Sequence, residues 1–156
     1  DAEEWGLWGS KYFAANSPVP LEDIVAVINL DMLGRNEPGE VWVIGSPRID
    51  DFSERSPDLA RATETAAGLT GIKLVYPTAI GREENIFYRS DHASFFLVRA
   101  DPIPAVFYTA GLHPDYHTPA DTADKINNEK VRDMARFALF VLWGVSELSV
   151  PPVYNE

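Results

Sequence analysis

Apolar segments of strand type alternate with segments of helical periodicity, and this alternation limits the possible folds more than any other feature of the chain. The segment IVAVINLDM, at 24–32, is a continuous apolar run rich in β-branched residues, which predicts a strand covered on both faces. Three further segments of strand type follow at 41–45, 72–76 and 103–109. Strands that alternate with helices form layered α/β folds, so we expect a mostly parallel, mixed sheet flanked by helices.

Helical periodicity marks three longer segments, at 5–16, between Ser56-Pro57 and Gly71, and at about 128–148. Serine followed by proline is typical of a helix start, and glycine of a helix end. A shorter helix is expected over HASFFLVR, capped by the preceding Ser90 and Asp91. In the second helix we expect a buried stripe of Leu59, Ala62, Ala66 and Leu69.

Length and charge exclude several classes of protein. The chain has 156 residues, enough for one domain with a buried core, and no apolar run approaches the length that spans a membrane. Its 24 acidic residues against 13 basic ones give a formal net charge of −11. Such a surface repels nucleic acid and anionic membranes, so neither is expected as a partner.

The chain contains no cysteine, which excludes disulfides and thiolate ligands. Any bound metal must therefore be held by His, Asp or Glu. No signal peptide is visible, and a start at DAEE without methionine is typical of the interior of a longer polypeptide. The compartment stays open, although a secreted or periplasmic parent protein is compatible with this start.

Acidic residues stand where strands end and helices begin. Glu3 and Glu4 precede the first helix, where their charge would favour a helix N-terminus, or they could act in catalysis. Asp31 interrupts the apolar sequence VINLDML. A buried carboxylate there requires a metal or a cationic partner, unless Asp31 lies just past the strand in water. In parallel sheets, ligands bind beyond the carboxyl ends of the strands, which favours a site near Asp31.

The loop after the fourth strand carries His117, in the sequence YHTPADTADKIN. A single loop histidine is either a solvated group or a metal ligand. Asp121 is typical of a turn, and Asp91 of a helix cap. Each of these residues alone is a weak indication of function.

Taken together, the motifs resemble the zinc peptidases of the M28 type, which include bacterial leucyl-type aminopeptidases. The matching segments stand in the family's order and cover nearly the whole chain: AEEWGLWGSKYF, INLDMLGR, SDHASFF, IPAVFYTAG and YHTPADTADKI. The resemblance implies a zinc exopeptidase-like α/β fold over residues 1–150, followed by a tail at 151–156. It also implies that the chain is the C-terminal portion of one catalytic domain and lacks that domain's N-terminal strands.

The resemblance further implies two zinc ions and a role for each candidate residue. Glu3 would be the general base that takes a proton from water, and Glu4 and His117 would bind one zinc ion, with Asp31 on the other. Asp91 and Asp121 would orient His117 through its other ring nitrogen. From residue type alone, Tyr108 or Tyr116 would donate a hydrogen bond to the oxyanion.

Two elements of the family pattern have no counterpart in this chain. A histidine in the sequence His-x-Asp and a bridging aspartate stand upstream of the Glu-Glu pair in the family, whereas only Asp1 and Ala2 precede it here. We therefore expect this chain alone to bind zinc weakly or not at all and to hydrolyse nothing. An uncovered sheet edge would then invite pairing with the missing N-terminal half or with a second chain.

The function implied by the resemblance is removal of N-terminal residues from a peptide substrate by an aminopeptidase. Glutaminyl cyclases and carboxypeptidase-like members of the same family use similar metal ligands and remain alternatives. A peptidase-like domain that serves interaction rather than catalysis is a further alternative, and so is an acidic α/β domain whose motifs match by accident.

Overall fold

The structure, a computed structural model, describes residues 2–45, 52–77 and 85–155. At its centre is a sheet in the order β1-β4-β2-β3. The strands are β1 (Val27–Leu30), β2 (Glu40–Ile44), β3 (Lys73–Val75) and β4 (Ala105–Thr109). β1 is parallel to β4, and β2 to β3, while β2 and β4 are antiparallel. The predicted α/β fold with a mixed, mostly parallel sheet is confirmed.

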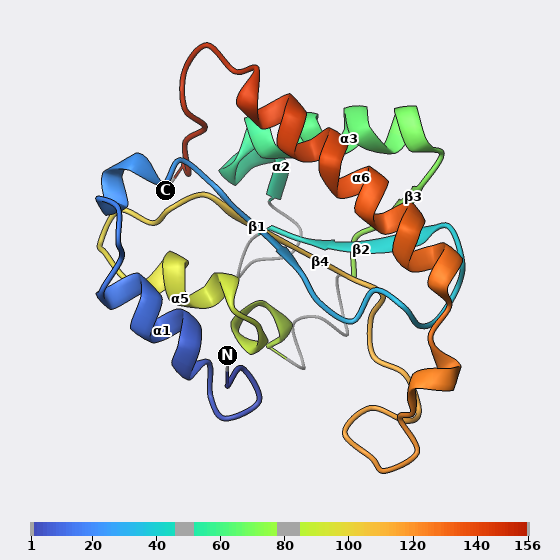
Figure 1. The fold of residues 1–156 in the computed structure, drawn as a ribbon. Coiled ribbons are helices and arrows are strands. Elements are labelled where there is room, and N and C mark those ends of the chain that lie inside the picture. Colours follow the sequence, from blue (N-terminus) through green and yellow to red (C-terminus); the bar gives the residue numbers. More distant parts are fainter. Residues whose placement is uncertain (1, 46–51, 78–84, 156) are drawn as a thin grey trace.

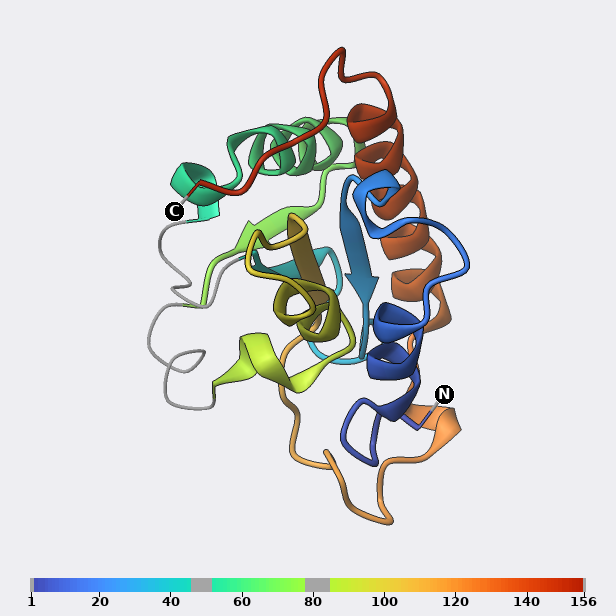
Figure 2. The same ribbon diagram turned by 90° about the vertical axis from the view of Figure 1, so that its left-hand side faces the viewer.

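Helices cover both faces of this sheet (Figures 1 and 2). On one face lie α3 (Pro57–Thr70) and α6 (Asn128–Ser146), and on the other lie α1 (Trp8–Ala15) and α5 (His92–Leu97). A short helix, α2 (Phe52–Arg55), precedes α3. Single turns of 3-10 helix are found at Leu21–Asp23, Ile86–Arg89 and Ala123–Lys125.

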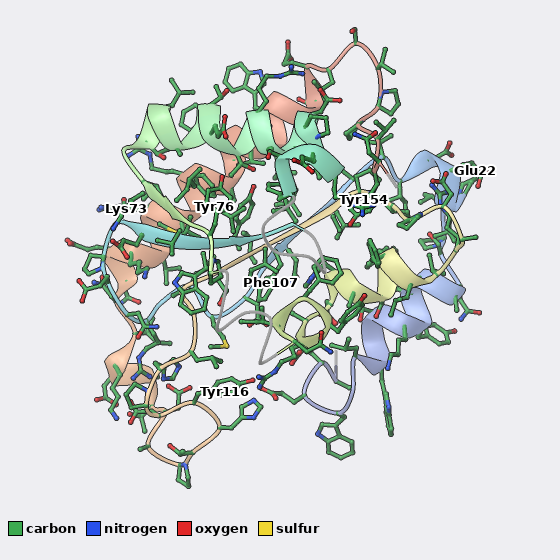
Figure 3. All side chains as sticks on the ribbon, turned by 180° about the vertical axis from the view of Figure 1, so that it is seen from behind. Glu22, Lys73, Tyr76, Phe107, Tyr116 and Tyr154 are labelled. Carbon is green, nitrogen blue, oxygen red and sulfur yellow. The ribbon has the colours of Figure 1, made fainter. Side chains whose placement is uncertain are left out.

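The alternation of side chains along the strands divides the core into two parts. Val106 and Tyr108 of β4 join the apolar cluster beneath α3 and α6. Phe107, labelled in Figure 3, lies between them in the strand. It belongs to a second apolar cluster, with Ile86 and Phe87. Because successive side chains of a strand face opposite sides, one residue's difference in position decides which half of the core a side chain enters.

The run at 24–32 forms a shorter and more exposed strand than predicted. Only Val27–Leu30 are extended, and Leu30 is 44% exposed. Within the described residues β1 pairs with β4 alone and is therefore an edge strand. Its apolar composition predicts burial on both faces. A strand at the edge of a sheet has a neighbouring strand on one side only, so its side chains are more exposed.

The signals at the ends of α3 predict its boundaries well. Pro57 takes the first helical position, and Gly71 ends the helix in the left-handed region at φ 74°. Leu69, expected in the buried stripe, is instead 63% exposed. The cap at Ser56 also differs, because its hydroxyl donates to the carbonyl of Val153 at 3.1 Å and accepts no bond from a helix amide.

The first helix is shorter than the predicted segment 5–16. Gly6 and Leu7 have positive φ angles of 94° and 62°, so the helix begins at Trp8. Its buried side is formed by Ser10 and Ala14, while Trp5, Trp8 and Tyr12 are exposed. The aromatic spacing thus identifies the helix but marks its solvent side.

The final helix begins as predicted and ends at Ser146. The Asn127 side chain caps it by accepting from the amide of Lys130 at 3.0 Å. The segment after α6 returns to α2, where the amide of Asn155 donates to the carbonyl of Arg55 at 2.6 Å. Within the described ranges, no helix combines the length and apolar character needed to cross a membrane.

Candidate functional site

Two loops leave the sheet at the same edge. Leu30 pairs with Tyr108 at the ends of the parallel strands β1 and β4, and the amide of Asp31 donates to the carbonyl of Tyr108 at 3.2 Å. The segment 31–37 follows β1, and the loop 110–127 follows β4. This topology brings Asp31 and the loop that carries His117 to one end of the sheet, where ligands of such folds bind.

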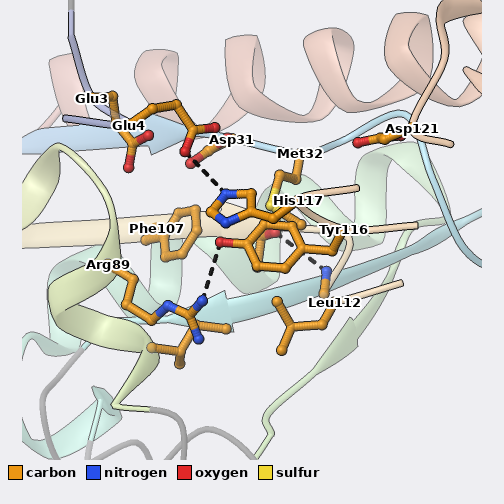
Figure 4. A pocket seen from close by; sticks show the side chains of 13 residues that line it. Glu3, Glu4, Asp31, Met32, Arg89, Phe107, Leu112, Tyr116, His117 and Asp121 are labelled. Carbon is orange, nitrogen blue, oxygen red and sulfur yellow. Dashed lines mark hydrogen bonds and ion pairs between the residues drawn. The ribbon is translucent and has the colours of Figure 1, made fainter. Parts of the chain in front are cut away.

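The N-terminal turn brings Glu3 and Glu4 to the same place. The carbonyl of Glu3 accepts from the amides of Gly6 and Leu7 at 3.0 and 2.9 Å, which closes a tight turn before α1. Ala2 and Leu7, on either side of this turn, have φ angles of 60° and 62°. In Figure 4, the side chains of Glu3 and Glu4 lie beside Asp31 and His117.

His117 makes the closest contact in this group. Its Nε2 lies 3.0 Å from Oε2 of Glu4, and its ring stacks on Tyr116 with centroids 3.9 Å apart. The hydroxyl of Tyr116 in turn accepts from Nη2 of Arg89 at 3.1 Å. His117 has a φ of 56°, a conformation that costs a non-glycine residue of order 1–3 kcal/mol and that clusters at functional sites.

Asp31 lies at the end of β1 and is held by a hydroxyl group. Ser90 Oγ donates to Oδ2 of Asp31 at 2.8 Å and accepts from Nδ2 of Asn29 at 2.8 Å. The next residue, Met32, again has a positive φ of 57°. Glu3 and Asp31 thus each adjoin a residue in the left-handed region, Ala2 and Met32, and His117 is itself in that region.

One pocket contains all four principal candidates, Glu3, Glu4, Asp31 and His117. The apolar part of its wall consists of Met32, Ile86, Phe107 and Leu112. Figure 4 shows Glu3, Glu4 and Asp31 together near the imidazole of His117, with Phe107 beside that ring and Leu112 below the ring of Tyr116. The pocket therefore combines groups that bind cations or carry protons with a surface that accepts an apolar side chain.

The carboxyl of Glu3 has a perturbed proton affinity. Partial burial raises its pKa, and the negative charges of Asp31, Glu4 and Asp91 raise it further, while His117 lowers it. A carboxyl whose pKa moves toward neutrality is better suited to accept and return a proton than one in water.

The donor atoms match zinc in type but not in number. Carboxylate and imidazole are ordinary zinc ligands, and the contact between Glu4 and His117 shows that two of them converge. Among the residues that the structure describes, however, no three His, Asp or Glu side chains gather closely enough to hold a metal ion. A catalytic zinc normally has three protein ligands, so these residues provide part of a site.

The structure separates the remaining candidates. Tyr116 lines the pocket, whereas Tyr108 is fully buried under α3, and its hydroxyl lies 2.5 Å from Oγ1 of Thr63. Burial raises the pKa of the Tyr108 hydroxyl. This placement corrects the expectation that Tyr108 is an oxyanion donor, because alternation along β4 turns it away from the site.

Asp91 and Asp121 also differ from expectation. Asp121 binds the guanidinium of Arg35, and its second oxygen lies 3.7 Å from Nε2 of His113. Asp91 precedes α5 without capping it and contributes its charge near Glu3. Within the described residues, neither carboxylate forms a hydrogen bond or ion pair with the ring of His117.

Three residues that contact the site group were not predicted: Arg35, Arg89 and Ser90 in this role. Ser90 is predicted to cap a helix. Its hydroxyl instead donates to Asp31 and accepts from Asn29, and α5 has no side-chain cap bond. Arg35 ends the motif INLDMLGR and Arg89 directly precedes SDHASFF, but nothing in their spacing indicates which distant carboxylate or hydroxyl they contact.

Comparison with known proteins places the chain among peptidases. A model of peptidase family M28 matches residues 1–142. An aminopeptidase from Aneurinibacillus sp. strain AM-1 is 29% identical with a TM-score of 0.69, over 99% of this chain and 32% of that one.

LapA of Legionella pneumophila, described as an aminopeptidase, is 24% identical with a TM-score of 0.66, over 94% of this chain and 38% of that one, and supports the fold. No curated protein matches the chain. The chain spans 32% of the length of the Aneurinibacillus enzyme. Since the family model covers most of its residues, the chain belongs to peptidase family M28.

Proposed function

We propose that the chain is the C-terminal portion of the catalytic domain of a dizinc aminopeptidase, which hydrolyses the N-terminal bond of peptides. The observation that carries the proposal is the 3.0 Å approach of His117 Nε2 to Glu4 Oε2, between residues far apart in the sequence. A carboxylate and an imidazole aimed at each other in a shared pocket with Asp31 match the division of ligands expected in the family.

In this proposal Glu4 and His117 hold one zinc ion and Asp31 holds the other. Zinc bound there would lower the pKa of a water molecule and polarise the scissile carbonyl. The neighbouring carboxylate, Glu3, takes the proton of the attacking water and returns it to the leaving amine. Its raised pKa supports this role, because the same group must both accept and release a proton.

Two further groups would contact the substrate. The hydroxyl of Tyr116 accepts from Arg89, which leaves the hydroxyl's own proton for donation to a carbonyl oxygen. The apolar wall of Met32, Ile86, Phe107 and Leu112 favours a substrate with an apolar N-terminal side chain. The loop 77–89 is a further candidate for substrate contacts, and residues 78–84 of it lie outside the described residues.

The remaining zinc ligands come, in this proposal, from an upstream part of the same polypeptide or from a second chain. β1 has one strand partner within the described part of the chain, so its other edge can pair. Val25 and Leu30, on or beside this strand, are exposed apolar residues. The 156-residue chain alone is therefore expected to be inactive.

The deciding experiment compares this chain with the complete polypeptide that contains it. The complete polypeptide should hydrolyse leucyl-p-nitroanilide, lose activity with a chelator, and recover it with zinc. Glu3→Gln should lower kcat by roughly 10²–10⁴-fold while zinc content is unchanged. Activity that survives both the chelator and this substitution contradicts the proposal.

Two alternatives are tested by the same preparation. A non-catalytic interaction domain is favoured by the lack of a three-donor group among the described residues, and it predicts no zinc binding by the complete polypeptide. A glutaminyl cyclase or a carboxypeptidase-like enzyme predicts zinc binding, but turnover only of peptides with N-terminal glutamine or of C-terminal bonds, respectively.

A further inference from the structure

The segment after β1 and the loop after β4 are joined along their length. The amide of Ala110 donates to the carbonyl of Met32 at 3.2 Å, and the amide of Asn127 donates to the carbonyl of Gly34 at 2.9 Å. The side chain of Asn36 also donates to the carbonyls of Ala110 and Leu112, at 2.9 and 3.0 Å. The loop that carries His117 is thus fixed at both of its ends to the segment that follows Asp31.

Arg35 binds two carboxylates of this loop. Its Nη2 donates to Oδ2 of Asp115, and its Nη1 donates to Oδ1 of Asp121. The two carboxylates stand on either side of His117 in the sequence, so one guanidinium holds both ends of the turn that presents the imidazole. The fixed fork of a guanidinium suits two acceptors better than a lysine ammonium does.

This guanidinium is better placed than an ordinary surface cation. Its side chain is 14% exposed, whereas exposed ion pairs contribute only about 0.2–1 kcal/mol because water screens them. The backbone of Arg35 is also anchored, since Nζ of Lys130, a residue that is 2% exposed, donates to the carbonyls of Arg35 and Glu37 at 2.7 and 2.6 Å. The backbone that carries the Arg35 guanidinium is therefore held in place by the buried Lys130.

His117 needs such support because its own conformation is unfavourable. A left-handed φ of 56° persists in a non-glycine residue only where the surroundings enforce it. The His117 ring itself contacts Tyr116 and Glu4, and both the ring and Glu4 are largely exposed. The bonds from Arg35 restrain this turn on both sides of His117. Arg89 binds the turn at Tyr116 and Lys125 binds it at Asp115, both before His117 in the sequence.

We infer that Arg35 is a positioning residue, which holds His117 in its pocket-facing conformation through Asp115 and Asp121. It also links the loop of His117 to the segment of Asp31, so that the two parts of the site keep their relative position. The inference concerns conformation in the first place, and its consequence for zinc rests on the proposed function.

The conformation is tested on the chain itself by NMR of the histidine ring protons. In the wild type, stacking on Tyr116 shifts the His117 signals away from those of an unstacked imidazole. Arg35→Met should move them toward the unstacked values, and Arg35→Lys should give an intermediate shift. The matched control is Arg61→Met, since Arg61 pairs with Asp58 within α3 at 2.5 Å and should leave the signals in place.

A charge-reversed pair separates positioning from general loosening. Arg35→Asp should displace the His117 signals, and Arg35→Asp combined with Asp121→Arg should restore part of the shift. In the complete polypeptide, Arg35→Met should weaken zinc binding, measured by calorimetry, by roughly 10–100-fold, the usual effect of losing a group that orients a ligand. The melting temperature should fall further than in Arg61→Met, because the side chain of Arg35 is 14% exposed and that of Arg61 68%.

The outcomes distinguish the inference from the proposed function. Unchanged His117 signals in Arg35→Met overturn the inference. A displaced ring with unchanged zinc affinity supports the positioning role of Arg35 and contradicts the assignment of His117 as a zinc ligand. If the wild-type complete polypeptide binds no zinc, the proposed function fails. The NMR arm then decides by itself whether Arg35 holds the ring.

Discussion

Nε2 of His117 lies 3.0 Å from Oε2 of Glu4, which joins the loop after β4 to the turn before α1. If the two side chains share a zinc ion, neither can be removed without loss of metal. We expect His117→Ala and Glu4→Ala each to lower the zinc affinity of the complete polypeptide at least about 100-fold, more than the loss of a merely orienting group.

Calorimetric zinc titration measures this effect, with Glu22→Ala, an exposed carboxylate remote from the pocket, as the control. The double variant should be little worse than either single variant, because each has already lost the shared ion. Full zinc affinity in His117→Ala would remove this histidine from the site.

A second prediction concerns the buried His92, whose ring lies between Phe87 and Phe107, with centroids 4.7 and 4.9 Å away. Burial lowers the pKa of His92 to about 3 in the folded chain. Below its unfolded pKa of about 6.5, the unfolded chain therefore binds a proton that the folded chain does not. The free energy of unfolding should fall from pH 6.5 toward pH 3, by up to about 1.4 kcal/mol per pH unit from this group.

Urea unfolding at a series of pH values tests this dependence. His92→Phe removes the titrating group from an aromatic environment and should flatten the acid slope below pH 6.5. Phe87→Leu disturbs the same environment without a titrating group, so it should lower stability at every pH and keep the slope. An unchanged slope in His92→Phe would assign the acid sensitivity to other residues.

Tyr108 and Tyr116, the two candidate oxyanion donors by residue type, should respond oppositely to loss of their hydroxyls. Tyr108→Phe removes a buried bond to Thr63, which keeps its own bond to the Leu59 carbonyl at 2.7 Å, and should cost about 1 kcal/mol of stability. Its effect on kcat should be negligible. Tyr116→Phe should leave stability within about 0.5 kcal/mol and, if Tyr116 contacts the oxyanion, lower kcat by roughly 10²–10³-fold.

Both variants are compared by thermal unfolding of the chain and by turnover of the complete polypeptide. A loss of kcat in Tyr108→Phe without loss of stability would restore Tyr108 as a candidate. A Tyr116→Phe variant with unaltered kcat would leave the oxyanion to other groups.

The sequence predicts the elements of this fold well, because their signals are local. Pro57 and Gly71 mark the ends of α3 by backbone geometry that depends on those residues alone. Which side of an element is buried is harder to predict from the sequence, since it depends on what packs against that element. The exposed Leu69 illustrates this point, because its helical spacing matches that of residues that are buried.

The candidate site follows the same division. The contact between Glu4 and His117 follows from no local sequence rule. It is predicted only by the order of the motifs along the chain, which is characteristic of the family's fold. The prediction of Tyr108 as an oxyanion donor is wrong. Alternation along β4 places Tyr108 and Phe107 on opposite faces of the sheet, so the two residues cannot both face the pocket. The bonds of Arg35 to Asp115 and Asp121 join segments distant in the chain, and neither spacing nor composition indicates them.

The final prediction concerns Gly111, which lines the pocket in a left-handed conformation at φ 84°. A Cβ atom there would lie 2.7 Å from the indole ring of Trp42. Gly39, at φ 73°, has no atom within 4 Å of such a Cβ and is the matched control. Gly39→Ala should cost about 1–2 kcal/mol from backbone strain alone, and Gly111→Ala about 1–3 kcal/mol more, because the ring must also move. Urea unfolding of both variants gives the difference, and equal losses would show that Trp42 yields without cost.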